Sequence, residues 1–186
     1  MSCVFLTGAN RGIGLELVRQ YAADGWRVIA TCRNPDGAGD LARIVEESNG
    51  RVERHQLEVT DTSSVAAIAE AFASESIDVL INNAGMGSIT NASSDGETCY
   101  RISKAAVNML TKLMAGYVAD RGITVAAIGP GWVRTDMGGP NATSGVEESV
   151  SRVRKVIEGL APTDSGGYFD NQANPSRGDL SHSIHD

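Results

Sequence analysis

The chain has 186 residues, of which 41% are hydrophobic and 21% charged, a composition typical of one globular domain large enough to bury a core. Its formal net charge of -7 argues against nucleic acid or an anionic membrane surface as a partner. No apolar run approaches the roughly 18 residues needed to span a bilayer, and its three cysteines form no CxxC pair, so we expect a cytoplasmic protein.

The first half of the chain alternates between short apolar runs and amphipathic segments. Strands are predicted at CVFLTG, WRVIATC, RVERHQLEV and IDVLINNAG, and helices over residues 10–25, 36–49 and 62–72. Asp61 or Thr62 supplies a cap for the third of these helices. Such regular alternation is typical of an α/β fold in which helices cover both faces of a parallel sheet.

The second half begins with a long predicted helix, RISKAAVNMLTKLMAGYVADRG. It carries an apolar stripe, which consists of Ile102, Ala105, Ala106, Met109, Leu110, Leu113 and Tyr117. A buried strand is predicted at ITVAAIGPG and an amphipathic helix over Val146–Leu160. Gly, Pro, Asn, Asp and Ser dominate from Ala161 onward. We therefore predict one domain over residues 1–165 and an irregular or disordered tail over 166–186.

The segment TGANRGIG joins the first predicted strand to the first helix. Glycines allow the backbone to turn tightly and to approach a pyrophosphate, whose charge the helix N-terminus favours. The alternative is a tight turn with no ligand. The position after the first strand of an alternating pattern favours phosphate binding, with six candidate residues, Gly8, Asn10, Arg11, Gly12, Ile13 and Gly14.

The end of the second predicted strand distinguishes between the two nicotinamide dinucleotides. An acidic residue there would bind a ribose 2′-hydroxyl and favour NAD. This chain has Arg33 at that point and Arg11 inside the glycine loop. Two guanidiniums suit a 2′-phosphate because they offer forked, charge-assisted hydrogen bonds. NADP is therefore the predicted cofactor, the alternative being two solvated arginines.

Tyr100 and Lys104 are spaced i and i+4 at the predicted start of a helix, so they share a face. An ammonium close to a phenol favours the phenolate and lowers the phenol pKa from about 10. This change moves a tyrosine toward the range that is useful for proton transfer at neutral pH.

Four motifs in this order, TGANRGIG, NNAG, YRISK and PGWVRTDM, resemble the short-chain dehydrogenase/reductase family in its C-factor-like branch. The resemblance implies a Rossmann-type doubly wound parallel sheet and hydride transfer between a nicotinamide and a small carbonyl or alcohol. It implies that Tyr100 is the acid/base, and that Lys104 binds the nicotinamide ribose and lowers the tyrosine pKa. It also implies a cofactor-lining set that comprises Asn83, Ala84, Gly85, Pro130, Gly131 and Thr135, with Asp36 or Glu58 near the adenine.

Members of that family have a further helix and strand between NNAG and the tyrosine, and the strand ends in a serine that binds the substrate oxygen. Only fourteen residues, Met86–Cys99, lie there in this chain, too few for a helix, a strand and their loops. We therefore expect one internal helix and strand to be missing, and Ser88, Ser93 or Ser94 is the nearest substitute for the serine. The strand at Ile123–Ile128 would then pair directly with Val79–Asn82 to satisfy the backbone.

Two functions remain open from the sequence. The first is an NADP-dependent oxidoreductase; the second is a catalytically impaired NADP-binding or interaction protein, or a truncated gene product, that has lost the serine segment. The resemblance implies a homo-oligomer, which the missing interface helix puts in question. We expect a small-molecule substrate, with no nucleic acid or membrane partner. His182 and His185 lack the ligands that would complete a metal site, so none is predicted.

Overall fold

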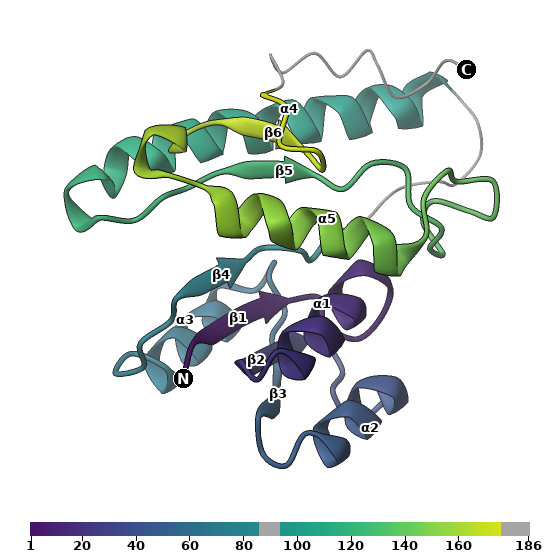
Figure 1. Cartoon of the computed structure of the whole chain (residues 1–186), viewed down its shortest axis with the longest axis vertical. Coiled ribbons are helices and arrows are strands. Elements are labelled where there is room, and N and C mark those ends of the chain that lie inside the picture. Colours follow the sequence, from purple (N-terminus) through teal and green to yellow (C-terminus); the bar gives the residue numbers. More distant parts are fainter. Residues whose placement is uncertain (86–93, 176–186) are drawn as a thin grey trace. The chain divides into compact units, whose positions relative to one another are not determined.

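The computed structural model describes residues 1–85 and 94–175, and the chain divides into two compact units, Met1–Met86 and Gly87–Asp186 (Figure 1). The first unit contains β1 (Cys3–Thr7), α1 (Gly12–Ala23), β2 (Arg27–Cys32), α2 (Gly39–Glu47), β3 (Val52–Gln56), α3 (Thr62–Ala71) and β4 (Val79–Ile81). The second contains α4 (Ser94–Tyr117), η1 (Ala119–Arg121), β5 (Ala127–Gly129), α5 (Val146–Gly159), η2 (Pro162–Asp164) and β6 (Tyr168–Asp170).

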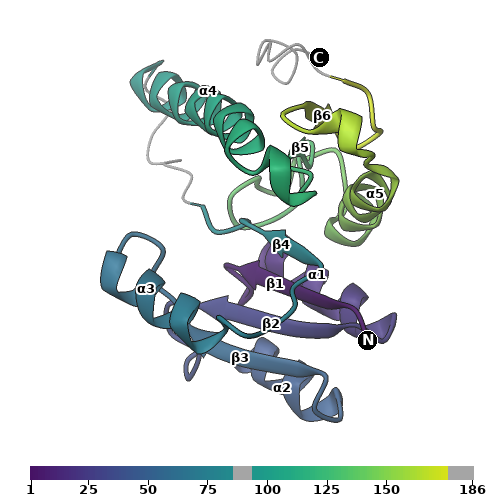
Figure 2. The same cartoon turned by 90° about the vertical axis from the view of Figure 1, so that its left-hand side faces the viewer.

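The first unit is built on a four-stranded parallel sheet in the order β3-β2-β1-β4. Figure 2 shows α3 on one face of this sheet, and α1 and α2 on the other. Because successive side chains of a strand point to opposite faces, β1 contributes to both layers of the core. Cys3 and Phe5 pack with Ile29, Leu57 and α3 on one face. The other face and the helices against it supply fully or almost fully buried side chains, which include Val4, Leu6, Val28, Leu17, Val18, Tyr21 and Leu41.

Polar side chains fix the strands of the first unit at their amino ends. The backbone N–H of Cys3 donates to the carboxylate of Asp78 at 2.7 Å, and the N–H of Asp78 donates to the Cys3 carbonyl at 3.0 Å. The Arg27 guanidinium at the start of β2 bonds Glu53 in β3 at 2.8 Å and also pairs with Glu75. These contacts tie β1 to β4, and β2 to β3, across long stretches of sequence.

The second unit contains a two-stranded parallel sheet, β5-β6, with α4 and α5 packed against β5 (Figure 2). The described buried side chains of α4 are Thr111 and Ala115, spaced so that they share one helix face, and Val118 just beyond the helix is also buried. In α5 the buried residues are Ser149, Val150, Val153, Arg154 and Val156. Among the described helices, including the 24-residue α4, none combines the length and apolar content of a bilayer-crossing segment.

The predicted α/β Rossmann-type parallel sheet is confirmed, as is the short connection before the tyrosine helix. β4 ends at Ile81 and α4 begins at Ser94, which leaves no room for a further helix and strand between them. Asp61 caps α3 as expected, because its side chain accepts from the N–H of Ser63 at 3.0 Å.

Three details of the sequence prediction are wrong. The strand predicted at ITVAAIGPG is shortened to β5 (Ala127–Gly129), which pairs with β6 within the second unit. Within the first unit, β4 lies at the edge of the four-stranded sheet. Residues 168–170, predicted as irregular tail, form β6, because pairing with β5 satisfies their backbone. His182 and His185 lie outside the described residues.

The third correction concerns α4. Its first residue is Ser94, so Tyr100 and Lys104 lie in the second and third turns of the helix and not at its start. Within the apolar stripe, Ile102 and Leu113 are both 64% accessible. Thr111 and Ala115 are buried, and Ala115 lies close to Gly166 in the segment before β6.

Candidate functional site

The glycine loop between β1 and α1 admits no side chain at two positions. Gly8 has φ +68°, and a Cβ there would lie 2.8 Å from the Cα of Ala84. A Cβ on Gly14 would lie 2.1 Å from the Gly8 carbonyl oxygen. Gly12, with φ +55°, begins α1. The helix N-terminus therefore follows the loop directly, and its unsatisfied N–H groups favour an anion there.

The NNAG segment after β4 is hydrogen-bonded to this loop. The side-chain amide of Asn83 donates to the carbonyls of Thr7 at 3.0 Å and Gly8 at 3.1 Å. The N–H of Ala84 donates to Thr7 Oγ1 at 3.0 Å. Asn83 thus holds the ends of β1 and β4 together, a structural role in addition to the predicted one of lining a cofactor. Thr7 was not among the predicted site residues; its hydroxyl, just before the first glycine, was the available signal.

Cationic side chains lie at the carboxyl end of β2 and in the loop. Arg33 follows Cys32 directly; its side chain is 68% exposed, and its Nε lies 3.9 Å from a carboxylate oxygen of Glu58. Hydrogen bonds from Thr60, together with the Arg33 charge, lower the pKa of Glu58. Arg11, the residue before α1, is exposed. This edge of the sheet presents positive charge, with one carboxylate beside it.

Other residues predicted near the nucleotide have mixed surroundings. Asn10 is exposed, Ile13 is partly buried, and Gly85 has open space on its side-chain position except for a carbonyl at 3.8 Å. Asp36 is 94% exposed and lies 3.8 Å from Arg54. The structure therefore places the loop, the NNAG segment and Arg33 in one unit, at the carboxyl ends of its parallel strands, where ligands bind in open α/β sheets.

Tyr100 and Lys104 stand on one face of α4. The Lys104 ammonium lies 5.4 Å from the centroid of the Tyr100 ring, and the tyrosine is 43% exposed. Tyr100 also influences Tyr168 of β6 electrostatically. The pKa of the Tyr168 phenol is raised mainly by burial, then by the charge of Asp170, and least by Tyr100. The phenol and the ammonium are therefore adjacent, accessible groups in the second unit.

Of the three candidate substitutes for the missing serine, Ser94 is the first residue of α4, and Ser88 and Ser93 lie outside the described residues. In residues 1–85 and 94–175, no three His, Cys, Asp or Glu side chains gather as a metal site would require.

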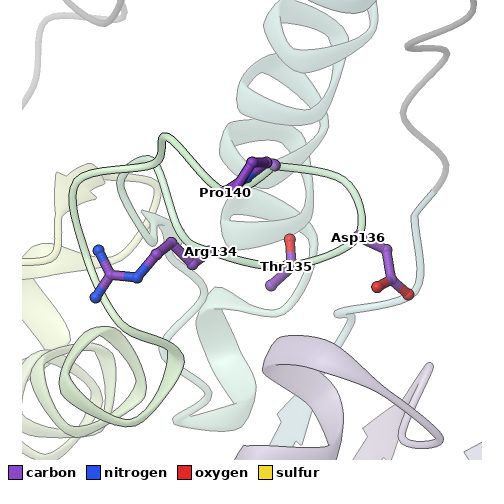
Figure 3. Close-up of a pocket in the computed structure, with 5 residues that line it drawn as sticks. Arg134, Thr135, Asp136 and Pro140 are labelled. Carbon is purple, nitrogen blue, oxygen red and sulfur yellow. The ribbon is translucent and has the colours of Figure 1, made fainter.

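The segment after β5 forms a turn and then a loop that surrounds a pocket. Gly131 has φ +81° in the turn that follows β5. Beyond it, Arg134, Thr135, Asp136, Gly139 and Pro140 line a pocket of about 440 Å³ (Figure 3). Arg134 points away from Asp136, and its guanidinium donates to the carbonyls of Ala142 and Thr143. Thr135 Oγ1 accepts from the N–H of Gly138 at 3.1 Å, which shapes the loop.

Family models match both parts of the chain. The short chain dehydrogenase model matches residues 2–98, and the model described as enoyl-(acyl carrier protein) reductase matches residues 87–167. C-signal of Myxococcus xanthus is 44% identical over 87 residues, which span 47% of this chain and 52% of that protein. The chain thus matches about half the length of C-signal.

Two longer matches cover most of the chain. The 3beta-hydroxysteroid dehydrogenase 1 of Eggerthella lenta is 30% identical over 184 aligned residues, which span 71% of this chain and 70% of that enzyme. The crystal structure of an NADPH-bound carbonyl reductase from chicken fatty liver superposes with a TM-score of 0.83 at 28% identity, covering 95% of this chain and 98% of the reductase.

Proposed function

This chain belongs to the short-chain dehydrogenase/reductase family, and we propose that it is an NADP-dependent oxidoreductase that transfers a hydride between nicotinamide and a small carbonyl or alcohol. The observation that carries the proposal is the adjacent pair on α4, in which the Lys104 ammonium lies 5.4 Å from the Tyr100 ring. A phenol next to an ammonium is suited to give and take a proton at a substrate oxygen.

The residues of the first unit fit a dinucleotide. Gly8 and Gly14 let the loop pack closely against the NNAG segment and turn directly into α1, which begins at Gly12, so the helix N-terminus is available to a pyrophosphate. Arg33 is exposed beyond the end of β2, where a ribose 2′-phosphate would compete with Glu58 for its guanidinium. These features support NADP over NAD. The structure of the carbonyl reductase from chicken fatty liver contains bound NADPH.

The proposed chemistry divides between cofactor and protein. Bound NADPH supplies the hydride that reduces the carbonyl carbon. Tyr100 donates its phenolic proton to the carbonyl oxygen, so that the product is an alcohol, and Lys104 stabilises the phenolate that remains. A proton from solvent then restores the phenol. In the oxidative direction the same phenolate accepts the proton of the alcohol.

A second candidate is an NADP-binding or interaction protein with impaired catalysis. The short connection between Ile81 and Ser94 favours it, because no strand that ends in a substrate-binding serine fits there. Without that group, the substrate oxygen has one fewer hydrogen-bond donor near Tyr100. In this reading the first unit still binds the nucleotide, while the second serves another purpose or none.

The proposed partners are a small-molecule substrate and a second copy of this chain. Self-association is supported by the exposed apolar side chains of α4, which include Ile102, Met109, Leu110, Leu113 and Tyr117. An exposed apolar face of this extent on one helix is characteristic of a protein interface. The net charge of -7 remains unfavourable for nucleic acid.

Thermal unfolding with and without nucleotide tests the cofactor. If NADPH binds the native state and not the unfolded chain, a concentration about 100-fold above Kd stabilises the native state by about 2.7 kcal/mol. At this chain length that stabilisation raises Tm by roughly 5–10 °C. NADH should raise it less. In Arg33→Ala we expect NADPH affinity to fall about tenfold or more, with NADH affinity unchanged, because a charged hydrogen bond is lost.

Reduction of a panel of small carbonyls, followed by NADPH absorbance, tests the chemistry. Tyr100→Phe should keep the nucleotide-induced Tm rise and lose reduction, since only the hydroxyl is removed. Nucleotide binding without any reduction by the wild-type chain would favour the second candidate. Absence of a Tm rise with either nucleotide would overturn both.

A further inference from the structure

Side chains from two other parts of the second unit form hydrogen bonds to the turn after β5. The carbonyl oxygen of Pro130 accepts one hydrogen bond from Ser149 Oγ at 2.7 Å and another from Asn171 Nδ2 at 2.8 Å. Ser149 lies in the first turn of α5 and is fully buried, and Asn171 directly follows β6. A carbonyl oxygen has two lone pairs, so both acceptor positions are filled.

Side chains from the segment around β6 also cover the glycines on either side of Pro130. Tyr168 Oη lies 2.7 Å from the position that a Cβ on Gly129 would take. Asn171 Nδ2 lies 3.1 Å from the corresponding position on Gly131. We call Ser149, Tyr168 and Asn171 the turn clamp, because together they enclose the Gly129–Gly131 backbone.

The clamp determines which way the next amide points. The described peptide bonds are all trans, and in a trans peptide the C=O and the following N–H point in opposite directions within one plane. With the Pro130 oxygen directed at Ser149 and Asn171, the N–H of Gly131 faces the opposite side. The φ of +81° at Gly131, a value that glycine adopts readily, allows the chain to continue from there.

We propose that Ser149 and Asn171 are positioning residues that pre-form the Pro130–Gly131 turn for the nicotinamide half of the dinucleotide, an inference that rests on the proposed function. Fixed backbone groups bind a ligand more tightly than mobile ones, because less conformational freedom is lost on binding. Loss of a clamp bond should therefore weaken a ligand that contacts the turn. It should not affect a ligand that ends at the adenosine half, which the first unit binds.

Binding calorimetry with two nucleotides separates these cases. NADPH carries the nicotinamide, whereas 2′,5′-ADP carries only the adenosine and its 2′-phosphate. Asn171→Asp keeps the shape of the side chain and replaces the N–H donor by a carboxylate oxygen that repels the Pro130 carbonyl. We expect it to weaken NADPH about tenfold, and Ser149→Ala about threefold, with 2′,5′-ADP unchanged in both. Asn171→Gln, which retains the donor, should recover much of the NADPH affinity.

Hydrogen exchange of the nucleotide-free chain provides a second readout. In Asn171→Asp the amides of Gly129 and of residues 131–135 should exchange faster while those of α5 keep their protection, which excludes general unfolding. Unchanged exchange in the turn, unchanged NADPH affinity, or equal losses of NADPH and 2′,5′-ADP would each overturn the inference. If the wild-type chain binds neither nucleotide, the proposed function fails, and the exchange data alone decide whether the clamp positions the turn.

Discussion

Replacing Gly14 by alanine sets two opposing effects against each other. Alanine in a helix interior is favoured over glycine by about 0.8–1.0 kcal/mol. Against this gain, the new Cβ would lie 2.1 Å from the Gly8 carbonyl oxygen and 2.6 Å from Asn83 Nδ2. The loop or the helix must therefore move by roughly 1 Å, and overpacking with a backbone shift costs about 1–3 kcal/mol. Because the nearest atom belongs to the backbone, we expect the upper end of this range and a net loss of about 1–2 kcal/mol.

Urea unfolding of Gly14→Ala alongside Gly39→Ala provides the comparison. Gly39 begins α2, lacks a positive φ, and would have no atom within 4 Å of its new Cβ. The control should thus be neutral or gain up to about 1 kcal/mol. Gly14→Ala should also weaken NADPH by about tenfold or more, since a displacement of this size misaligns the loop. A Gly14→Ala variant as stable as the control and as tight for NADPH would refute the packing described for this loop.

Three further variants test the ion pairs and the helix faces. The Arg27 guanidinium lowers the pKa of Glu53 below 4.5, so this carboxylate stabilises the fold above pH 4.5, and the contribution disappears as pH falls through the lowered pKa. In Glu53→Gln the free energy of unfolding should therefore fall less steeply as the pH is lowered below 4.5. An unchanged slope would contradict the pairing of Glu53 with Arg27. Leu113→Lys should change stability by less than about 0.5 kcal/mol while Ala115→Lys costs more than about 2 kcal/mol, as measured by urea unfolding. Light scattering of Leu113→Lys should show loss of self-association, and an unchanged mass would exclude this face as the interface.

The elements of the first unit were predictable because their signals are local. Val4 and Val28 continue apolar runs, and Val52 begins an alternating segment; the three strands pair in parallel as expected. Asp61 starts a helix through its own side chain, which accepts from a nearby N–H. In each case, a residue and its close neighbours in sequence are sufficient to determine the conformation.

The second unit was less predictable because its structure depends on distant partners. Tyr168–Asp170 is a three-residue strand that pairs with Ala127–Gly129, and the Gly-, Asn- and Asp-rich sequence around it resembles a loop. The helical period of α4 was visible in the sequence, but the face that it buries depends on what lies beside it. Ser149 and Asn171 gave no signal at all, since a serine in a helix and an asparagine in a Gly/Asn-rich segment are ordinary. Only the structure brings both to the Pro130 carbonyl.

The central position of β1 has a consequence for how the protein is made. β1 leaves the ribosome before the other strands of its sheet, yet its partner β4 pairs with it through contacts such as Cys3 with Asp78, 75 residues later. At translation rates of about 5–20 residues per second, that delay is roughly 4–15 s. During this interval one edge of β1 is unpaired, while β2 can already occupy the other. The four-stranded sheet is therefore complete only after β4 has been made, and β1, which is synthesised before β2, acquires both of its neighbours after β2 can pair with β3.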